Sequence, residues 1–299
     1  MLNNNALSQT RQVNPPHEHT GYLWAGLGIL CFCLTLPVTK IMLPDFSPMF
    51  IALGRSAIAG IIAVLLLWRA KAPLPSLKQV VWLISSSIGI VFGFPILSAL
   101  AMQSTSATHG GIIAALLPLS TAIAATLITR EKQSQRFWLY AFLASSLVLV
   151  FSLTAATGAI NQGDLWLVLS LPLGALGYAT GGYLSKQMPA WQVICWTLIL
   201  CLPITLPYTV VYWPTTVSDV ATNSWFGLIY VALFSQLLGF FFWNKGLALG
   251  GIAKVSQLQL LQPFGTLIAA SWLLGEVFEA HNLMACAAVV VLVYLGKRA

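Results

Sequence analysis

The sequence predicts an all-α integral membrane protein with ten transmembrane helices, arranged as two inverted five-helix repeats. Three observations predict this fold: an apolar composition, ten long apolar runs, and two similar segments that cross the membrane in opposite directions. The chain is 58% hydrophobic and 7% charged, whereas a soluble domain has about 25% charged residues. The composition therefore places the chain in a lipid bilayer.

Ten apolar runs are long enough to cross a bilayer, which requires about 20 residues of helix. In chain order they begin near Tyr22, Ser47, Val80, Ala107, Arg136, Gly163, Pro189, Trp225, Ile252 and Asn282. Short polar or proline-containing breaks separate them, such as RAKAPLPSLK after the second run and TREKQSQR after the fourth. These breaks leave no room for a soluble domain.

The chain is expected to divide into a tail and two repeats. Residues 1–21 are polar and contain prolines, so we expect a disordered cytoplasmic tail. The first five-helix repeat is expected at 22–157 and the second at 158–299.

The charges predict the orientation in the membrane. If the amino terminus is cytoplasmic, the cytoplasmic segments hold 12 of the 14 basic residues, and five of the seven acidic residues lie in outer segments. The 12 basic residues are Arg11, Arg69, Lys71, Lys78, Arg130, Lys132, Arg136, Lys186, Lys245, Lys254, Lys297 and Arg298. The positive-inside rule then predicts that both termini are cytoplasmic and that the number of spans is even.

Two 17-residue segments carry the repeat. ALLPLSTAIAATLITRE (Ala115–Glu131) and LLQPFGTLIAASWLLGE (Leu260–Glu276) lie 145 positions apart and agree at seven of 17 positions, among them a proline, a threonine and a glutamate. Five spans separate the two segments, and because five is odd the second copy crosses in the opposite direction. Inverted repeats can exchange conformations around a central site, so the pattern favours a transporter over an enzyme or a fixed receptor.

Several short motifs extend this pattern. The first span closes with Lys40, the second contains Gly54-Arg55, the fourth and ninth contain Pro118 and Pro263, and the ninth ends in Leu274-Gly275-Glu276. In this order, from Tyr22 to Lys297, the motifs resemble the EamA branch of the drug/metabolite transporter superfamily.

The resemblance implies a secondary transporter in a bacterial inner membrane, often an exporter of amino acids or other metabolites. Two positions depart from the family pattern. Thr129-Arg130-Glu131 replaces Leu-Gly-Glu in the first repeat, and Leu200 stands at the position that matches Arg55. The second departure makes a symmetric role for Arg55 doubtful.

Polar residues at membrane depth are the candidate substrate contacts, because an intramembrane Arg costs about 2.5 to 3.5 kcal/mol on insertion scales. Arg55 is predicted either to bind a carboxylate or phosphate of the substrate or to bond backbone carbonyls. Gln259, Gln262 and Thr266 form a stripe on the ninth span, and the alternative role for this stripe is hydrogen bonding between packed helices.

Three further residues complete the predicted substrate site: Gln236 and Trp243 on the eighth span and Tyr178 on the sixth. The five cysteines lie in apolar runs, and no group of residues has the spacing of a metal site, so neither a metal nor a cofactor is expected. His109, at the outer start of the fourth span, is expected to be solvated.

No Asp or Glu occurs near the middle of a predicted span, which disfavours cationic cargo. The predicted function is export of a small organic metabolite, and the alternatives are multidrug efflux of cationic compounds or a non-transporting scaffold or sensor. The expected partners are the small-molecule substrate and the lipid bilayer. Nucleic acid is not expected, and the protein is expected to be a monomer or homodimer.

Overall fold

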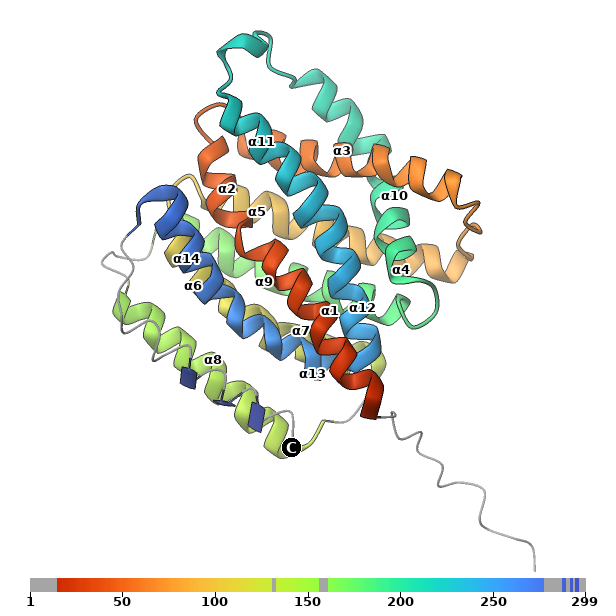
Figure 1. Cartoon of the computed structure of the whole chain (residues 1–299), viewed down its shortest axis with the longest axis vertical. Helices are drawn as coiled ribbons and strands as arrows, with labels where there is room; N and C mark the ends of the chain where they lie inside the picture. The colour runs from red at the N-terminus through yellow and green to blue at the C-terminus, as the bar shows by residue number, and fades with distance from the viewer. Residues whose placement is uncertain are drawn as a thin grey trace, which may run out of the picture.

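The computed structural model describes residues 15–130, 133–155, 161–276 and the six positions 287, 288, 291, 292, 294 and 295. Within these residues the regular elements are all helical (Figure 1). Seven helical stretches are long and apolar enough to cross a membrane: His19–Met42, Pro48–Arg69, Leu77–Ala101, Ala107–Thr129, Gln162–Leu184, Ala190–Val211 and Thr222–Gly250. The chain is therefore a multi-pass, all-helical membrane protein.

The described residues of the first half form ten helical elements, several of which join end to end in one span. They are α1 (Pro15–Cys33), α2 (Thr35–Met42), α3 (Pro48–Arg69), α4 (Leu77–Ser87), the π-helix η1 (Ile88–Gly93), α5 (Phe94–Ala101), α6 (Ala107–Ile113), the 3₁₀ turn η2 (Ala114–Leu116), α7 (Leu117–Thr129) and α8 (Gln135–Ala155).

The second half follows a similar order. It contains α9 (Gln162–Leu184), α10 (Ala190–Val211), the 3₁₀ turn η3 (Val217–Asp219), α11 (Thr222–Tyr230), the π-helix η4 (Val231–Gly239), α12 (Phe240–Gly250), α13 (Ile252–Ser256), the 3₁₀ turn η5 (Gln257–Leu261) and α14 (Gln262–Leu274).

The predicted helix starts agree closely with the structure from the second run to the ninth. The predicted starts at Ala107 and Ile252 coincide with those of α6 and α13, and Val80 lies three residues after the start of α4. Proline at the first turn or a serine cap marks several of these starts; Ser47, for example, accepts a hydrogen bond from the Phe50 amide. The tenth run, near Asn282, lies largely outside the described residues.

The amino-terminal helix starts earlier than predicted. α1 begins at Pro15 and so includes the last seven residues of the segment 1–21 that was expected to be a disordered tail. Pro15 and Pro16 suit the first turn of a helix, where an amide hydrogen has no intrahelical partner. Residues 1–14, and the predicted boundary between the repeats at 157/158, lie outside the described residues.

The two similar segments run antiparallel. The carboxylate of Glu276, just after α14, accepts hydrogen bonds from the backbone amides of Ala107 and Thr108 at the start of α6. At the other end of the same pair of spans, α13 packs against α7. The start of one copy therefore meets the end of the other, as an inverted repeat requires.

Helices from the first half also pack against helices from the second half. α1, from the first half, packs along α12 and η4 of the second half, whereas α9 of the second half packs along α4, η1 and α5 of the first (Figure 1). α3 packs against its counterpart α10. The centre of the bundle is therefore built from both repeats.

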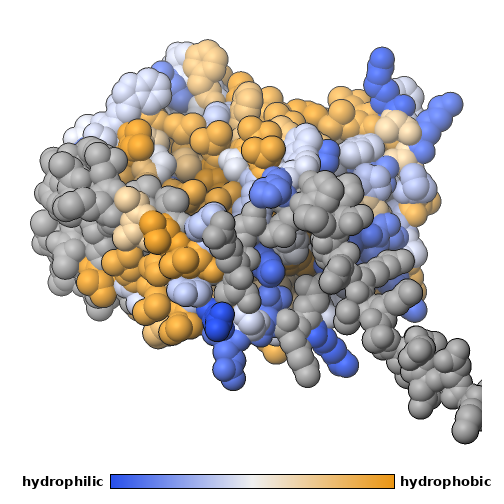
Figure 2. Space-filling view, turned by 60° about the horizontal axis from the view of Figure 1, so that its bottom comes forward, coloured by the Kyte–Doolittle hydropathy of each residue, from blue (hydrophilic) through white to orange (hydrophobic). Residues whose placement is uncertain are grey.

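The surface has the distribution of polarity that a bilayer imposes. Figure 2 shows broad hydrophobic areas on the visible face, and hydrophilic residues gather mainly along its right and lower edges. Exposed apolar side chains such as Leu65, Phe142, Val168 and Ile204 supply the hydrophobic surface. In a membrane these side chains contact lipid.

Candidate functional site

A small cavity, which we call the central chamber, lies between the two halves of the chain. Its volume is about 20 Å³, which is room for about one water molecule. Its lining residues come from both halves: Phe32, Thr35, Leu36, Arg55, Ile90, Phe94, Pro95, Tyr178, Ser235, Phe240 and Gln262. Five of the seven predicted site residues therefore line the chamber or bond directly to a residue that does: Arg55, Tyr178, Gln262, Gln236 and Gln259.

Arg55 is a buried cation whose described partners are neutral. Its side chain on α3 is 5% exposed. Nε donates to Gln236 Oε1 at 3.0 Å, and Nη2 donates to Gln236 Oε1 at 2.7 Å and to Ser235 Oγ at 3.2 Å. Among the described residues no carboxylate forms an ion pair with it. Burial of an unpaired charge is unfavourable, so the chamber favours an anionic group beside Arg55.

Two hydroxyl groups that sequence reasoning missed support this arrangement. Ser235 Oγ, which accepts from Arg55, also shares a hydrogen bond with Thr35 Oγ1 at 2.9 Å. Both residues are buried. Isolated hydroxyls are common in membrane helices, where they often bond within their own helix, so no sequence signal distinguished these two.

Both π-helices meet at Arg55. Ser235 and Gln236 belong to η4, and Gln236 Nε2 donates at 3.0 Å to the carbonyl of Ile90 in η1. The irregular hydrogen bonding of a π segment redirects side chains and makes carbonyls available, and such segments are frequent at functional sites. The acceptors that hold Arg55 are therefore positioned by backbone irregularities in both repeats.

A second polar group, which we call the amide layer, consists of Tyr178, Trp243, Asn244 and Gln259. Gln259 Nε2 donates to Tyr178 Oη at 3.3 Å and to Gln262 Oε1 at 3.1 Å. Gln259 is the third residue of η5 and Gln262 follows that 3₁₀ turn, whose three-residue period aligns side chains at i and i+3. This local geometry joins the amide layer to the chamber.

Aromatic rings surround Tyr178. The ring centroid of Trp243 lies 5.4 Å from it and that of Phe240 lies 5.6 Å from it, and the ring of Phe32 stacks at 6.3 Å. Trp243 is fully buried. It therefore packs beneath the chamber as a support for Tyr178 and Phe32 and does not line it.

Several buried polar atoms of the amide layer have no hydrogen-bond partner within the described part of the chain. They are Trp243 Nε1, Asn244 Nδ2, Asn244 Oδ1 and Gln259 Oε1. An unsatisfied buried polar group costs about 1 to 3 kcal/mol. These atoms are donors and acceptors that ordered water or a polar ligand would satisfy.

Thr266, the last residue of the predicted stripe, lies away from the chamber. It is buried, and its methyl group lies so close to Gly111 of α6 that a Cβ there would come within 3.0 Å. Gly111 thus permits α14 and α6 to approach closely, as small residues do between membrane helices.

One end of the bundle, which we call the Glu276 end, is closed by polar contacts. Glu276 caps α6 as described above, and Lys40 Nζ donates to the Thr105 carbonyl at 2.8 Å. Thr105 Oγ1 donates to Asn161 Oδ1 at 2.9 Å and to Asp164 Oδ1 at 3.1 Å. Lys40 and Glu276, two of the family motif residues, therefore hold the spans together at this end.

His109 belongs to the same network, so it is not the isolated histidine that was expected, although its side chain remains 22% exposed. Its Nε2 lies 3.1 Å from Asp164 Oδ1. Asp164 reaches His109 because the capping box between Asn161 and Asp164 fixes the start of α9.

At the opposite end of the bundle Lys245 Nζ lies 3.7 Å from the centre of the Trp24 ring.

Comparison with known proteins identifies the family. The model of the EamA-like transporter family matches residues 19–153 and 161–295. The chain is 40% identical over 256 residues to "Uncharacterized transporter YdeK" of Bacillus subtilis (strain 168), covering 86% of this chain and 89% of that protein. It is 24% identical over 268 residues to "WAT1-related protein At3g02690, chloroplastic" of Arabidopsis thaliana, covering 86% and 64% respectively.

A solved structure shares the fold. One crystal structure superposes with a TM-score of 0.70 at 15% sequence identity, covering 93% of this chain and 96% of the other. The family model covers each half of the chain separately, which accords with the two similar antiparallel segments. The chain belongs to the EamA-like transporter family.

Proposed function

We propose that this transporter exports a small organic metabolite with a carboxylate, such as an amino acid or a related solute, by alternating access around the central chamber. The observation that carries the proposal is Arg55, a buried cation that lines the chamber. Within the described residues, its hydrogen-bond acceptors are uncharged oxygens. A carboxylate there accepts charge-assisted hydrogen bonds from the guanidinium. The proposed contacts are Arg55, Gln236, Tyr178, Gln259 and Gln262.

Trp243 and Thr266 complete the predicted set with different roles. Trp243 supports Tyr178 and Phe32 by ring packing. Thr266 packs against Gly111, so its role is closure of α14 on α6. These two residues affect transport by positioning the spans.

The size of the chamber supports a mechanism that requires a conformational change. Binding sites for drug-sized ligands occupy about 300 to 1,000 Å³, whereas the chamber holds about 20 Å³. The structure thus resembles a contracted state that has to open before cargo enters. Breaks at η1, η2, η4 and η5, and at Leu34 between α1 and α2, offer positions where the spans can bend.

The proposed topology has ten spans, both termini in the cytoplasm and the Glu276 end facing out of the cell, in a bacterial inner membrane. The excess of basic residues in the segments assigned to the cytoplasm supports it. Cysteines introduced at 215–223 should react with an impermeant maleimide added outside, whereas cysteines at 71–76 should not. Reaction at 71–76 alone would reverse the proposed orientation.

The experiment for cargo is metabolite profiling of cells and medium with the gene deleted and overexpressed, followed by uptake into proteoliposomes of each solute that changes. Arg55→Gln should abolish movement of carboxylated solutes. Arg55→Lys keeps the charge but loses the two-pronged donor geometry, so it should retain partial transport.

Two results would contradict the proposal. Transport of quaternary ammonium dyes that survives Arg55→Gln would favour multidrug efflux of cationic compounds. An unchanged metabolite profile, together with no solute movement in proteoliposomes, would favour a scaffold or sensor.

A further inference from the structure

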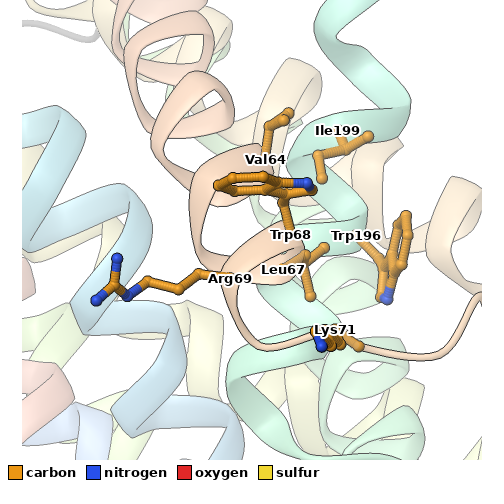
Figure 3. A pocket seen from close by; sticks show the side chains of 8 residues that line it. Val64, Leu67, Trp68, Arg69, Lys71, Trp196 and Ile199 are labelled. Atoms are coloured by element: carbon orange, nitrogen blue, oxygen red, sulfur yellow. The ribbon is translucent and has the colours of Figure 1, made fainter.

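A groove separate from the central chamber lies on the flank of the bundle, between the ends of α3 and α10. Its volume is about 740 Å³, and Val64, Leu67, Trp68, Trp196 and Ile199 line it together with two cations, Arg69 and Lys71 (Figure 3). Trp68 is 78% exposed and Val64 is 42% exposed. The groove therefore opens to the surroundings of the protein and is large enough for an extended ligand.

The chemistry of the walls is that of a membrane interface. Val64, Leu67 and Ile199 form an apolar floor, and Trp68 and Trp196 contribute two indole rings (Figure 3). Indoles combine an apolar body with a polar N–H and are enriched where a bilayer meets water. An apolar groove with these walls is suited to a hydrocarbon chain.

Lys71 supplies the charge at the mouth of the groove, and its backbone is strained. Its φ is 49°, and its amide donates to the Trp68 carbonyl while that of Ala72 donates to Leu67, both at 3.1 Å. These bonds form a Schellman motif, whose left-handed residue is usually glycine because a side chain there is unfavourable. A lysine in this unfavourable position indicates that its ammonium group has a functional role.

The directions of the two neighbouring cations differ. Figure 3 shows Lys71 beneath Leu67 and Trp196, while the side chain of Arg69, which also lines the groove, extends in another direction. Lys71 and Arg69 therefore both supply positive charge to the groove, and no described carboxylate lines it. The charge and the apolar floor together define one kind of ligand.

We propose that this groove binds an anionic glycerophospholipid, with an acyl chain along Val64, Leu67 and Ile199 and the phosphate headgroup at Lys71. Basic pockets between transmembrane helices bind anionic headgroups in this manner. The site is independent of the substrate chamber and of the proposed cargo.

The test measures lipid binding to the purified full chain after removal of endogenous lipid. Phosphatidylglycerol or phosphatidylcholine with identical acyl chains is added, bound lipid is counted by native mass spectrometry, and Tm is recorded. Phosphatidylglycerol should bind more tightly. In Lys71→Gly its affinity should fall about fivefold, because one interfacial basic residue contributes about 1 kcal/mol.

The same variant separates a lost lipid contact from a damaged fold. Glycine suits the left-handed position, so Lys71→Gly without lipid should melt no lower than the original protein. Lys71→Arg should keep phosphatidylglycerol affinity. Ile199→Trp, which fills the apolar floor of the groove and leaves the charge of Lys71 intact, should reduce phosphatidylglycerol affinity.

Lys78→Gln is the matched control, because it removes an exposed cation at the start of α4 that does not line the groove. Its affinity for phosphatidylglycerol should stay within about twofold of the original, a smaller loss than a groove cation gives. Equal losses in Lys78→Gln and Lys71→Gly would show general surface attraction and overturn the proposal. Equal affinity for the two lipids, or unchanged affinity in Lys71→Gly, would also overturn it.

Discussion

The fourth and ninth spans have the same backbone and different side chains. In each, a 3₁₀ turn precedes a 13-residue helix with proline at its second position, and the helix ends at a left-handed residue, Arg130 or Gly275. The residues at the turn differ: Gln259 and Gln262 in one copy match Ala114 and Leu117 in the other. Under the proposed function, the shared break serves the bending of both repeats, and the glutamines recognise an asymmetric cargo.

The third and eighth spans repeat this contrast. Each contains a π-helix, at Ile88–Gly93 and Val231–Gly239. With the 145-residue offset, Gln236 matches Val91 and Arg55 matches Leu200. One repeat interface thus carries a buried polar contact, and residues at the matching positions are apolar. Exchanging residues between matching positions tests whether polarity or backbone determines function.

The largest effect is expected for Gln236→Val, which introduces the residue of the first repeat. It removes the acceptor of two Arg55 hydrogen bonds and leaves the buried charge with the hydrogen bond to Ser235. The free energy of unfolding should fall by about 3 kcal/mol, measured by thermal or denaturant unfolding in detergent. Binding of the carboxylated substrate should fall as well.

The double variant Arg55→Leu/Gln236→Val provides the control. An apolar pair replaces a buried polar one, so much of the stability lost in Gln236→Val should return. Carboxylate transport should not return. A double variant that transports the carboxylated solute would show that Arg55 does not bind it.

An intermediate effect is expected for Gln262→Leu, again the residue of the other repeat. Gln262 is half-buried at the chamber, and its Oε1 accepts from Gln259. Its loss should weaken substrate affinity about tenfold, since one lost hydrogen bond is worth about 0.5 to 1.5 kcal/mol, with Tm nearly unchanged. Thr266→Val is the comparison variant. Thr266→Val should alter Tm more than substrate affinity. If Gln262→Leu mainly lowers Tm and Thr266→Val mainly lowers affinity, then Thr266 contacts the substrate and Gln262 serves helix packing.

The smallest effects are expected at the left-handed caps. Gly275 has φ 68° and Arg130 has φ 55°. Gly275→Ala should lower the free energy of unfolding by about 1 kcal/mol, because a Cβ is unfavourable in this conformation. Arg130→Gly should raise it by less than about 1 kcal/mol. Unfolding measurements that give the same sign for both would show that the two caps are not equivalent.

The sequence predicted the long elements well, for a physical reason. Length and apolarity are what a bilayer demands of a helix, and prolines, serine caps and basic breaks mark where the helices begin and end, as at Pro48 and Ala107. The π-helices were not predicted. A π turn shifts the hydrophobic pattern by about one residue, which a run that is apolar on all sides does not reveal.

The candidate site was predicted in part. Arg55, Gln236, Tyr178 and Gln262 stand out as polar residues in apolar runs, and the structure brings them to one region. Thr35, Ser235 and Asn244 did not stand out, because small polar residues also serve helix packing. Thr266 was placed on the stripe by helical periodicity, but a neighbouring span covers that part of the helix. Periodicity predicts a face of one helix and not its neighbour.

The small volume of the central chamber has a pharmacological consequence. A space of about 20 Å³ admits no organic inhibitor, so a competitive blocker binds a conformation in which the chamber is open. Its apparent affinity is reduced by the fraction of molecules in that conformation. Variants that favour opening should therefore be more sensitive to blockers, and a blocker should act from the side of the membrane on which its preferred conformation opens.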